Sequence, residues 1–145
     1  MRDFPHHYLV TASAEFEGNV ALKSDDVPEL VTALPEEFSG PGNQWSPETL
    51  LTGAVLTGFI FTFRTISHST GLEWSSLNCS AEGVLERVER VNRFTSFTIR
   101  ATLTAPADAD IPRLENMLEK AKAACLVAQS LLAETHLETD IITEN

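Results

Sequence analysis

The feature that most constrains this chain is a long run without a charged side chain, from Thr49 to Phe63. Ser46-Pro47-Glu48 precedes it and is typical of a helix start. The serine accepts a hydrogen bond from a free backbone N–H, the proline has no N–H to leave unpaired, and the glutamate meets the positive end of the helix dipole. Apolar side chains fall on nearly all sides of this helix: Leu50, Leu51, Ala54, Val55, Phe59, Ile60, Phe61, Phe63 and Ile66. We therefore predict a long helix that a sheet and a second subunit bury on several sides.

Strands are predicted before this helix. Residues 6–22 alternate apolar and polar side chains and contain the turn sequence Glu17-Gly18-Asn19, which indicates a hairpin. Val27–Leu30 predicts a further short edge strand, because Pro28 has no N–H to donate to a central ladder.

After the long helix, the sequence predicts two strands, a second helix and a last strand. Residues 77–81 and 97–103 alternate in the manner of strands, and the charged stretch Glu86–Arg93 between them is typical of an exposed hairpin end. Asp110 is predicted to cap the second helix, and Thr135–Thr143 to form a closing strand. The apolar positions of the second helix are Ile111, Leu114, Met117 or Leu118, Ala121, Cys125, Ala128 and Leu132. This order of elements predicts an α+β fold.

Composition limits the class of protein. A length of 145 residues with 43% hydrophobic residues predicts one domain, residues 1–145. The formal net charge of −11 repels phosphate groups, so we expect no nucleic acid and no membrane as partner. The uncharged run is too short to span a membrane, and the first residues do not resemble a secretion signal. With two cysteines there is no disulfide framework, so we predict a cytoplasmic location.

The cysteines by themselves favour structural roles, and the histidines favour positions at the surface or in a partner contact. Cys125 on a helix and Cys79 on a strand face are each typical of small core residues. Adjacent His6 and His7 point to opposite sides of a strand, and no ligand spacing around any histidine resembles a metal site. Gly40-Pro41-Gly42 lacks the lysine of a phosphate-binding loop. We therefore expect neither a metal nor a cofactor.

Several stretches in the right order resemble the OsmC/Ohr family, the osmotically inducible and organic-hydroperoxide-resistance proteins. They cover most of the chain, and the helix opening Ser-Pro-Glu-x-Leu-Leu is the most specific. They are residues 6–8, 37–43, 45–51, 76–79, 82–83, 118–121 and 125–126.

The resemblance implies an intertwined homodimer with two central helices enclosed by sheets and a site at the subunit interface. It implies reduction of organic hydroperoxides by two cysteines, the peroxidatic one ten residues after the glutamate that corresponds to Glu48. That position is Gly58, followed by Phe59 as in the family pattern, while Cys125 stands at the resolving position. The family's hairpin arginine has no counterpart in residues 16–19. Peroxide reduction needs a thiolate, so two-cysteine peroxidase activity is not expected.

Two hypotheses remain. In the first, the interface pocket beside Gly58 and Phe59 binds a small apolar molecule. In the second, Cys125 is a single reactive cysteine that reduces hydroperoxides with an external thiol, and Glu48 belongs to its site. The acidity of the Cys125 thiol separates the two.

Glycine inside a helix costs about 1 kcal/mol relative to alanine, so we expect something to occupy the space beside Gly58. The candidates are close helix packing, Phe59 of the partner subunit, or a ligand.

Overall fold

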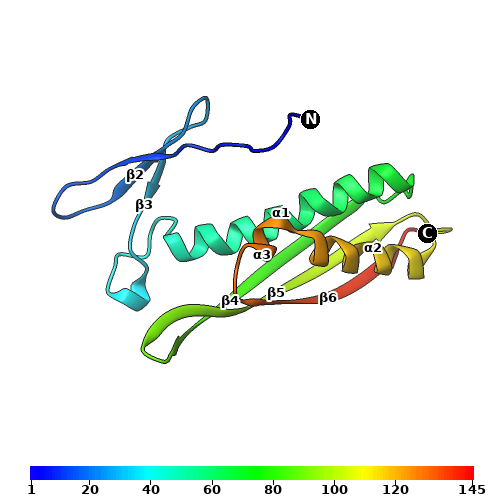
Figure 1. Cartoon of the computed structure of the whole chain (residues 1–145). Coiled ribbons are helices and arrows are strands. Elements are labelled where there is room, and N and C mark those ends of the chain that lie inside the picture. The colour runs from blue at the N-terminus through cyan, green and yellow to red at the C-terminus, as the bar shows by residue number, and fades with distance from the viewer. The chain divides into compact units, whose positions relative to one another are not determined.

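The computed structural model of the chain describes residues 1–145, which divide into two compact units, Met1–Leu50 and Leu51–Asn145. The elements are shown in Figure 1. In chain order they are β1 (Thr11–Ser13), β2 (Val20–Lys23), β3 (Leu30–Thr32), the 3-10 helix η1 (Glu36–Phe38), α1 (Pro47–Thr70), β4 (Ser76–Val88), β5 (Val91–Ala105), α2 (Ile111–Ala124), α3 (Leu126–Gln129) and β6 (Glu134–Thr143).

The first unit contains a three-stranded antiparallel sheet in the order β1-β2-β3. The predicted hairpin is confirmed, although its strands are shorter than the alternating residues suggested. Gly18 lies between them with a φ of 101°, a conformation that glycine adopts without steric cost. The predicted edge strand begins at Leu30, two residues after Pro28.

The start of α1 is confirmed as predicted. The Ser46 hydroxyl accepts a hydrogen bond from the backbone N–H of Thr49 at 3.1 Å, and Pro47 is the first helical residue. The backbone N–H of Ser46 in turn donates to the Thr49 hydroxyl at 2.9 Å. This reciprocal pair is a capping box in which threonine replaces the usual glutamate.

One stripe of α1 is buried within the chain. It consists of Val55, Phe59, Phe63 and Ser67, which are spaced four residues apart and so share one side of the helix. Outside this stripe the single chain covers α1 only in part, and Phe61 is 59% exposed. By length and composition alone α1 would also suit a membrane span, a property that the core helices of soluble proteins share.

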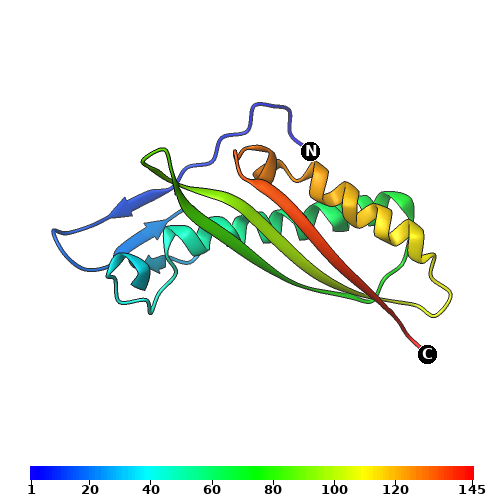
Figure 2. The same cartoon turned by 90° about the horizontal axis from the view of Figure 1, so that it is seen from below.

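The second unit is built on the sheet β4-β5-β6. Figures 1 and 2 show α1 and α2 on the same face of this sheet. The predicted inward alternation is confirmed, and Phe97 and Leu103 of β5 are almost completely buried. The last strand, β6, was also predicted, and it pairs with β5 in parallel. The core therefore lies between the two helices and one face of the sheet.

The end of the β4-β5 hairpin agrees with the prediction. The turn residues Glu89 and Arg90 have φ values of 50° and 70°, and Val88 pairs with Val91 across the turn. Gly83 lies on the inward side of β4, where a Cβ atom would come within 2.9 Å of the rings of Phe94 and Phe97. Glycine thus lets these two stacked rings approach the strand.

The second helix begins as predicted and ends earlier. The Asp110 carboxylate accepts a hydrogen bond from the backbone N–H of Arg113 at 3.2 Å. The prediction of one continuous helix to Leu132 is wrong, because α2 ends at Ala124 and Cys125 is extended, with φ −62° and ψ 112°. The side-chain amide of Gln129 donates to the carbonyl oxygen of Ala123 at 2.6 Å, which satisfies an acceptor that the break leaves free. Leu132, expected on the buried side, is 90% exposed.

Replacing Asp110 by alanine is expected to lower the free energy of unfolding by about 1 kcal/mol, because the Arg113 N–H loses its acceptor. Urea unfolding followed by circular dichroism measures the change. Asp108→Ala is the matched control, since Asp108 is exposed and precedes the cap. An equal loss in both variants would contradict a capping role.

Candidate functional site

Gly58 of α1 lies directly against the thiol of Cys125. A Cβ atom built on Gly58 would be 2.9 Å from the Cys125 Sγ and 3.3 Å from Cγ2 of Val127. Cys125 is 1% exposed, and its Sγ lies 4.0 Å from the carbonyl oxygen of Val55 as a weak hydrogen bond. The structure therefore brings together two of the residues that the sequence indicated, one from α1 and one from the break after α2.

The space beside Gly58 is filled by this chain itself. Cys125 and Val127 occupy the position where a side chain would begin, so close packing explains the glycine. Phe59 of the same chain belongs to the buried stripe that packs on the sheet. The break at Cys125 produces this contact, since the chain turns there from α2 into α3.

Cys79 is a poor nucleophile. It lies on the inward face of β4, where it pairs with Ala101 of β5, and it is half-buried. Burial raises the pKa of the Cys79 thiol to about 11, because the thiolate would lose its hydration. At neutral pH this residue is therefore a protonated core thiol. Neither cysteine is in a disulfide.

Glu48 does not share a compact site with Gly58 in one chain. It is the second residue of α1, and ten residues along a helix correspond to a rise of about 15 Å. A joint site would thus need Glu48 of a second chain.

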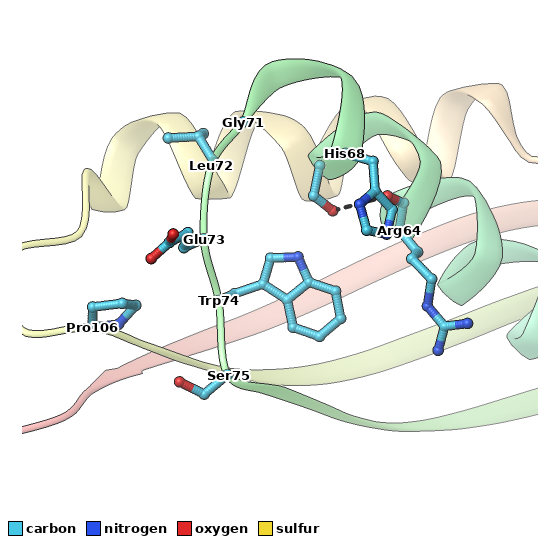
Figure 3. Close-up of a pocket in the computed structure, with 9 residues that line it drawn as sticks. Arg64, His68, Gly71, Leu72, Glu73, Trp74, Ser75 and Pro106 are labelled. Carbon is cyan, nitrogen blue, oxygen red and sulfur yellow. Dashed lines mark hydrogen bonds between the residues drawn. The ribbon is translucent and has the colours of Figure 1, made fainter.

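The structure also contains a pocket that sequence reasoning missed (Figure 3). It has a volume of about 560 Å³ and lies where α1 ends and β4 begins. Its lining residues are Arg64, Ser67, His68, Gly71, Leu72, Glu73, Trp74, Ser75 and Pro106. The available signal was the pair Arg64 and His68, four residues apart on α1 and followed by Trp74. Like the other histidines, His68 was expected at the surface or in a partner contact.

A family comparison agrees with this architecture. Residues 40–140 match the family described as OsmC-like protein. The chain belongs to the OsmC-like family. The match covers α1, α2 and all but the last three residues of the second sheet, and it includes both Gly58 and Cys125.

Individual relatives and solved structures extend the match over nearly the whole chain. The uncharacterized protein YmaD of Bacillus subtilis is 24% identical over 140 residues, covering 93% of both chains. An OsmC-like protein of unknown function from Vibrio cholerae has a TM-score of 0.84 at 14% identity, with 94% of this chain and 100% of that one covered. An organic hydroperoxide resistance protein from Elizabethkingia anophelis has a TM-score of 0.78 at 16% identity, with 99% and 100% covered. At these identities the solved structures establish the α+β OsmC-like fold.

Gly58→Cys is expected to form a disulfide with Cys125 within one chain. A separation of 2.9 Å between the Cβ position and Sγ is close to the value of about 3.0 Å that disulfide bond lengths and angles impose. If the two sulfurs are not bonded, the same separation is a steric clash between the new Cβ atom and the Cys125 Sγ. Disulfide formation therefore relieves this clash. Mass spectrometry after mild oxidation in a Cys79→Ser background should show the loss of two hydrogens and no free thiol.

Gly58→Cys with Cys125→Ser, in the same Cys79→Ser background, is the control and should keep its one free thiol. A folded Gly58→Cys protein that retains two free thiols, or that links two chains instead, would show that the contact differs in solution.

Proposed function

We propose that this OsmC-like protein is a homodimer that binds a small apolar molecule in a pocket of the subunit interface near Gly58, outside the space that Cys125 and Val127 fill, without two-cysteine peroxidase activity. The observation that carries the proposal is that the Gly58–Cys125 contact contains one thiol. By the family resemblance, Gly58 stands where active relatives have the peroxidatic cysteine.

The chemistry explains why one thiol is insufficient for that cycle. A peroxidatic thiolate attacks the outer oxygen of a hydroperoxide, which breaks the O–O bond, oxidises sulfur to a sulfenic acid and releases an alcohol. A second thiol then displaces water from the sulfenic acid to form a disulfide. Cys125 has no second cysteine beside it, and Cys79 is held protonated on the sheet.

The proposal of an apolar ligand is supported by proteins of similar fold and by the residues around Gly58. Structures with this fold include proteins named for organic hydroperoxide resistance, from Elizabethkingia anophelis and Legionella pneumophila. Around Gly58, the contacts come from Val127, Cys125 and the apolar part of α1. An apolar molecule, an organic hydroperoxide among them, suits such surroundings.

A second copy of the chain is the proposed partner. The outer side of α1 carries small residues, Gly53, Ala54 and Thr57, which would allow the helix of a second subunit to approach closely. Phe61 on the same side is 59% exposed. A second chain would remove this apolar surface from water.

The first unit gives independent support for a dimer. Only Thr32, Ala33 and Ser46 of its residues are buried, so it has no apolar core of its own. Its exposed large apolar side chains are Met1, Phe4, Tyr8, Leu9, Val10, Phe16, Val27, Val31, Leu34, Phe38 and Trp45. A unit of 50 residues without an apolar core of its own needs further cover. The acidic charge of the chain disfavours nucleic acid and anionic membranes as partners, and the proposed location is the cytoplasm.

The second candidate function is hydroperoxide reduction by Cys125 alone. The break between α2 and α3 favours it, because a thiol at a backbone break is closer to exposure than one inside a helix. An external thiol would then reduce the sulfenic acid. Against it stands the burial of Cys125, at 1% exposed.

Hydroperoxide turnover is expected to be no faster than the uncatalysed reaction, with cumene hydroperoxide as substrate and dithiothreitol as reductant. The reason is the missing thiol at Gly58. Peroxide consumption measured by a colorimetric assay tests this, with Cys125→Ser and Cys79→Ser as companions. Turnover abolished by Cys125→Ser would establish the single-thiol enzyme instead, whereas turnover abolished only by Cys79→Ser would place the site on the sheet.

Light scattering at low micromolar concentration is expected to give a mass of two chains. The driving force is burial of apolar surface, so the dimer should persist at high salt. Phe61→Glu should shift the equilibrium towards monomers, because it puts a charge on the proposed interface. Leu132→Glu is the control, because Leu132 is 90% exposed and lies in neither proposed contact surface, so this variant should keep the mass of two chains. A stable wild-type monomer would disprove the interface site.

A further inference from the structure

The pocket at the end of α1 is lined by side-chain hydrogen-bond donors that have no acceptor within the chain. It is lined by the guanidinium of Arg64, the imidazole of His68 and the indole of Trp74. None of these side chains donates a hydrogen bond or forms an ion pair within the described chain, residues 1–145. The serine hydroxyls of the pocket are occupied, since Ser67 donates to the carbonyl oxygens of Phe63 and Arg64, and Ser75 donates to Glu144.

Arg64 and His68 are placed together by the helix. Residues four positions apart lie on the same side of a helix, about one turn from each other. The Arg64 guanidinium also lies over the ring of Phe61, 5.2 Å from its centroid. Such a contact holds the guanidinium in place while its N–H edges stay free to bind an acceptor.

Trp74 supplies an apolar surface next to these donors. Its ring packs against the ring of Phe63 in the buried stripe, with centroids 5.4 Å apart. This contact with the core restricts the movement of the indole. In Figure 3 the indole extends to the side of Arg64 and His68, whereas the carboxylate of Glu73 points to the opposite side. Alternation along this extended segment separates the two side chains. The acidic group therefore does not occupy the donor side of the pocket.

We propose that this pocket binds a small organic carboxylate whose charged group contacts Arg64 and His68 and whose apolar part lies on the indole of Trp74. A volume of about 560 Å³ suits a molecule of this size. A monovalent anion fits better than a phosphate, because the site offers one permanent positive charge in a chain of net charge −11. The pocket begins six residues after Gly58, about 9 Å along the axis, so this site is separate from the Gly58–Cys125 contact.

The probe is benzoate, and benzamide is its uncharged counterpart of nearly equal shape. Isothermal titration calorimetry on the full chain should give saturable binding of benzoate, with benzamide at least about tenfold weaker, because it lacks the charge that Arg64 contacts. Trp45→Phe leaves Trp74 as the single tryptophan, whose fluorescence should change with the same midpoint. Should that variant fold poorly, calorimetry on the unmodified protein decides alone.

Arg64→Gln should weaken benzoate binding at least about tenfold. Arg113→Gln is the matched control, because it removes the same charge from an exposed position on α2 and should leave binding unchanged. Trp74→Leu should weaken benzoate more than acetate. The proposal is overturned if benzoate fails to saturate below about 10 mM, if benzamide or inorganic phosphate binds equally well, or if both arginine variants behave alike.

Discussion

The packing of one stripe of α1 on the inward face of the β4-β5-β6 sheet is the interaction on which the second unit depends. Phe59 and Phe63 are completely buried there, and Phe97 of β5 is buried with them. Burying a side chain of this size contributes about 1.5–3 kcal/mol, so a few aromatic residues provide much of the stability of this layer. The stripe also sets the rotation of α1, and therefore the directions in which Gly58 and Arg64 point.

With the rotation of α1 fixed, the geometry of the two candidate sites follows. Gly58 faces the break between α2 and α3, where the extended conformation of Cys125 turns its thiol towards α1. Arg64 and His68 face the pocket at the other end of the helix, next to the indole of Trp74. One glycine thus permits a close contact between α1 and Cys125. One tryptophan links the second pocket to the core through Phe63.

Local chemistry made most elements predictable. The caps at Ser46 and Asp110 and the charged hairpin end were confirmed, because each depends on residues that are neighbours in sequence. The break at Cys125 was not predictable, since the apolar period continues through Ala128 and no glycine or proline interrupts it. The amide of Gln129 stabilises this break by a contact six residues back, to the carbonyl oxygen of Ala123, a contact that no residue pattern indicates.

The sequence by itself determined the α+β order of elements, the position and start of the central helix, and the absence of a second thiol at Gly58, because these depend on composition and local backbone chemistry. Only the tertiary structure decided that Cys125 fills the space at Gly58, that β6 runs parallel to β5, and that Arg64, His68 and Trp74 form one pocket. These contacts join residues distant in the chain. Their geometry is set by how the helices rest on the sheet, and so it follows from packing rather than from any local pattern.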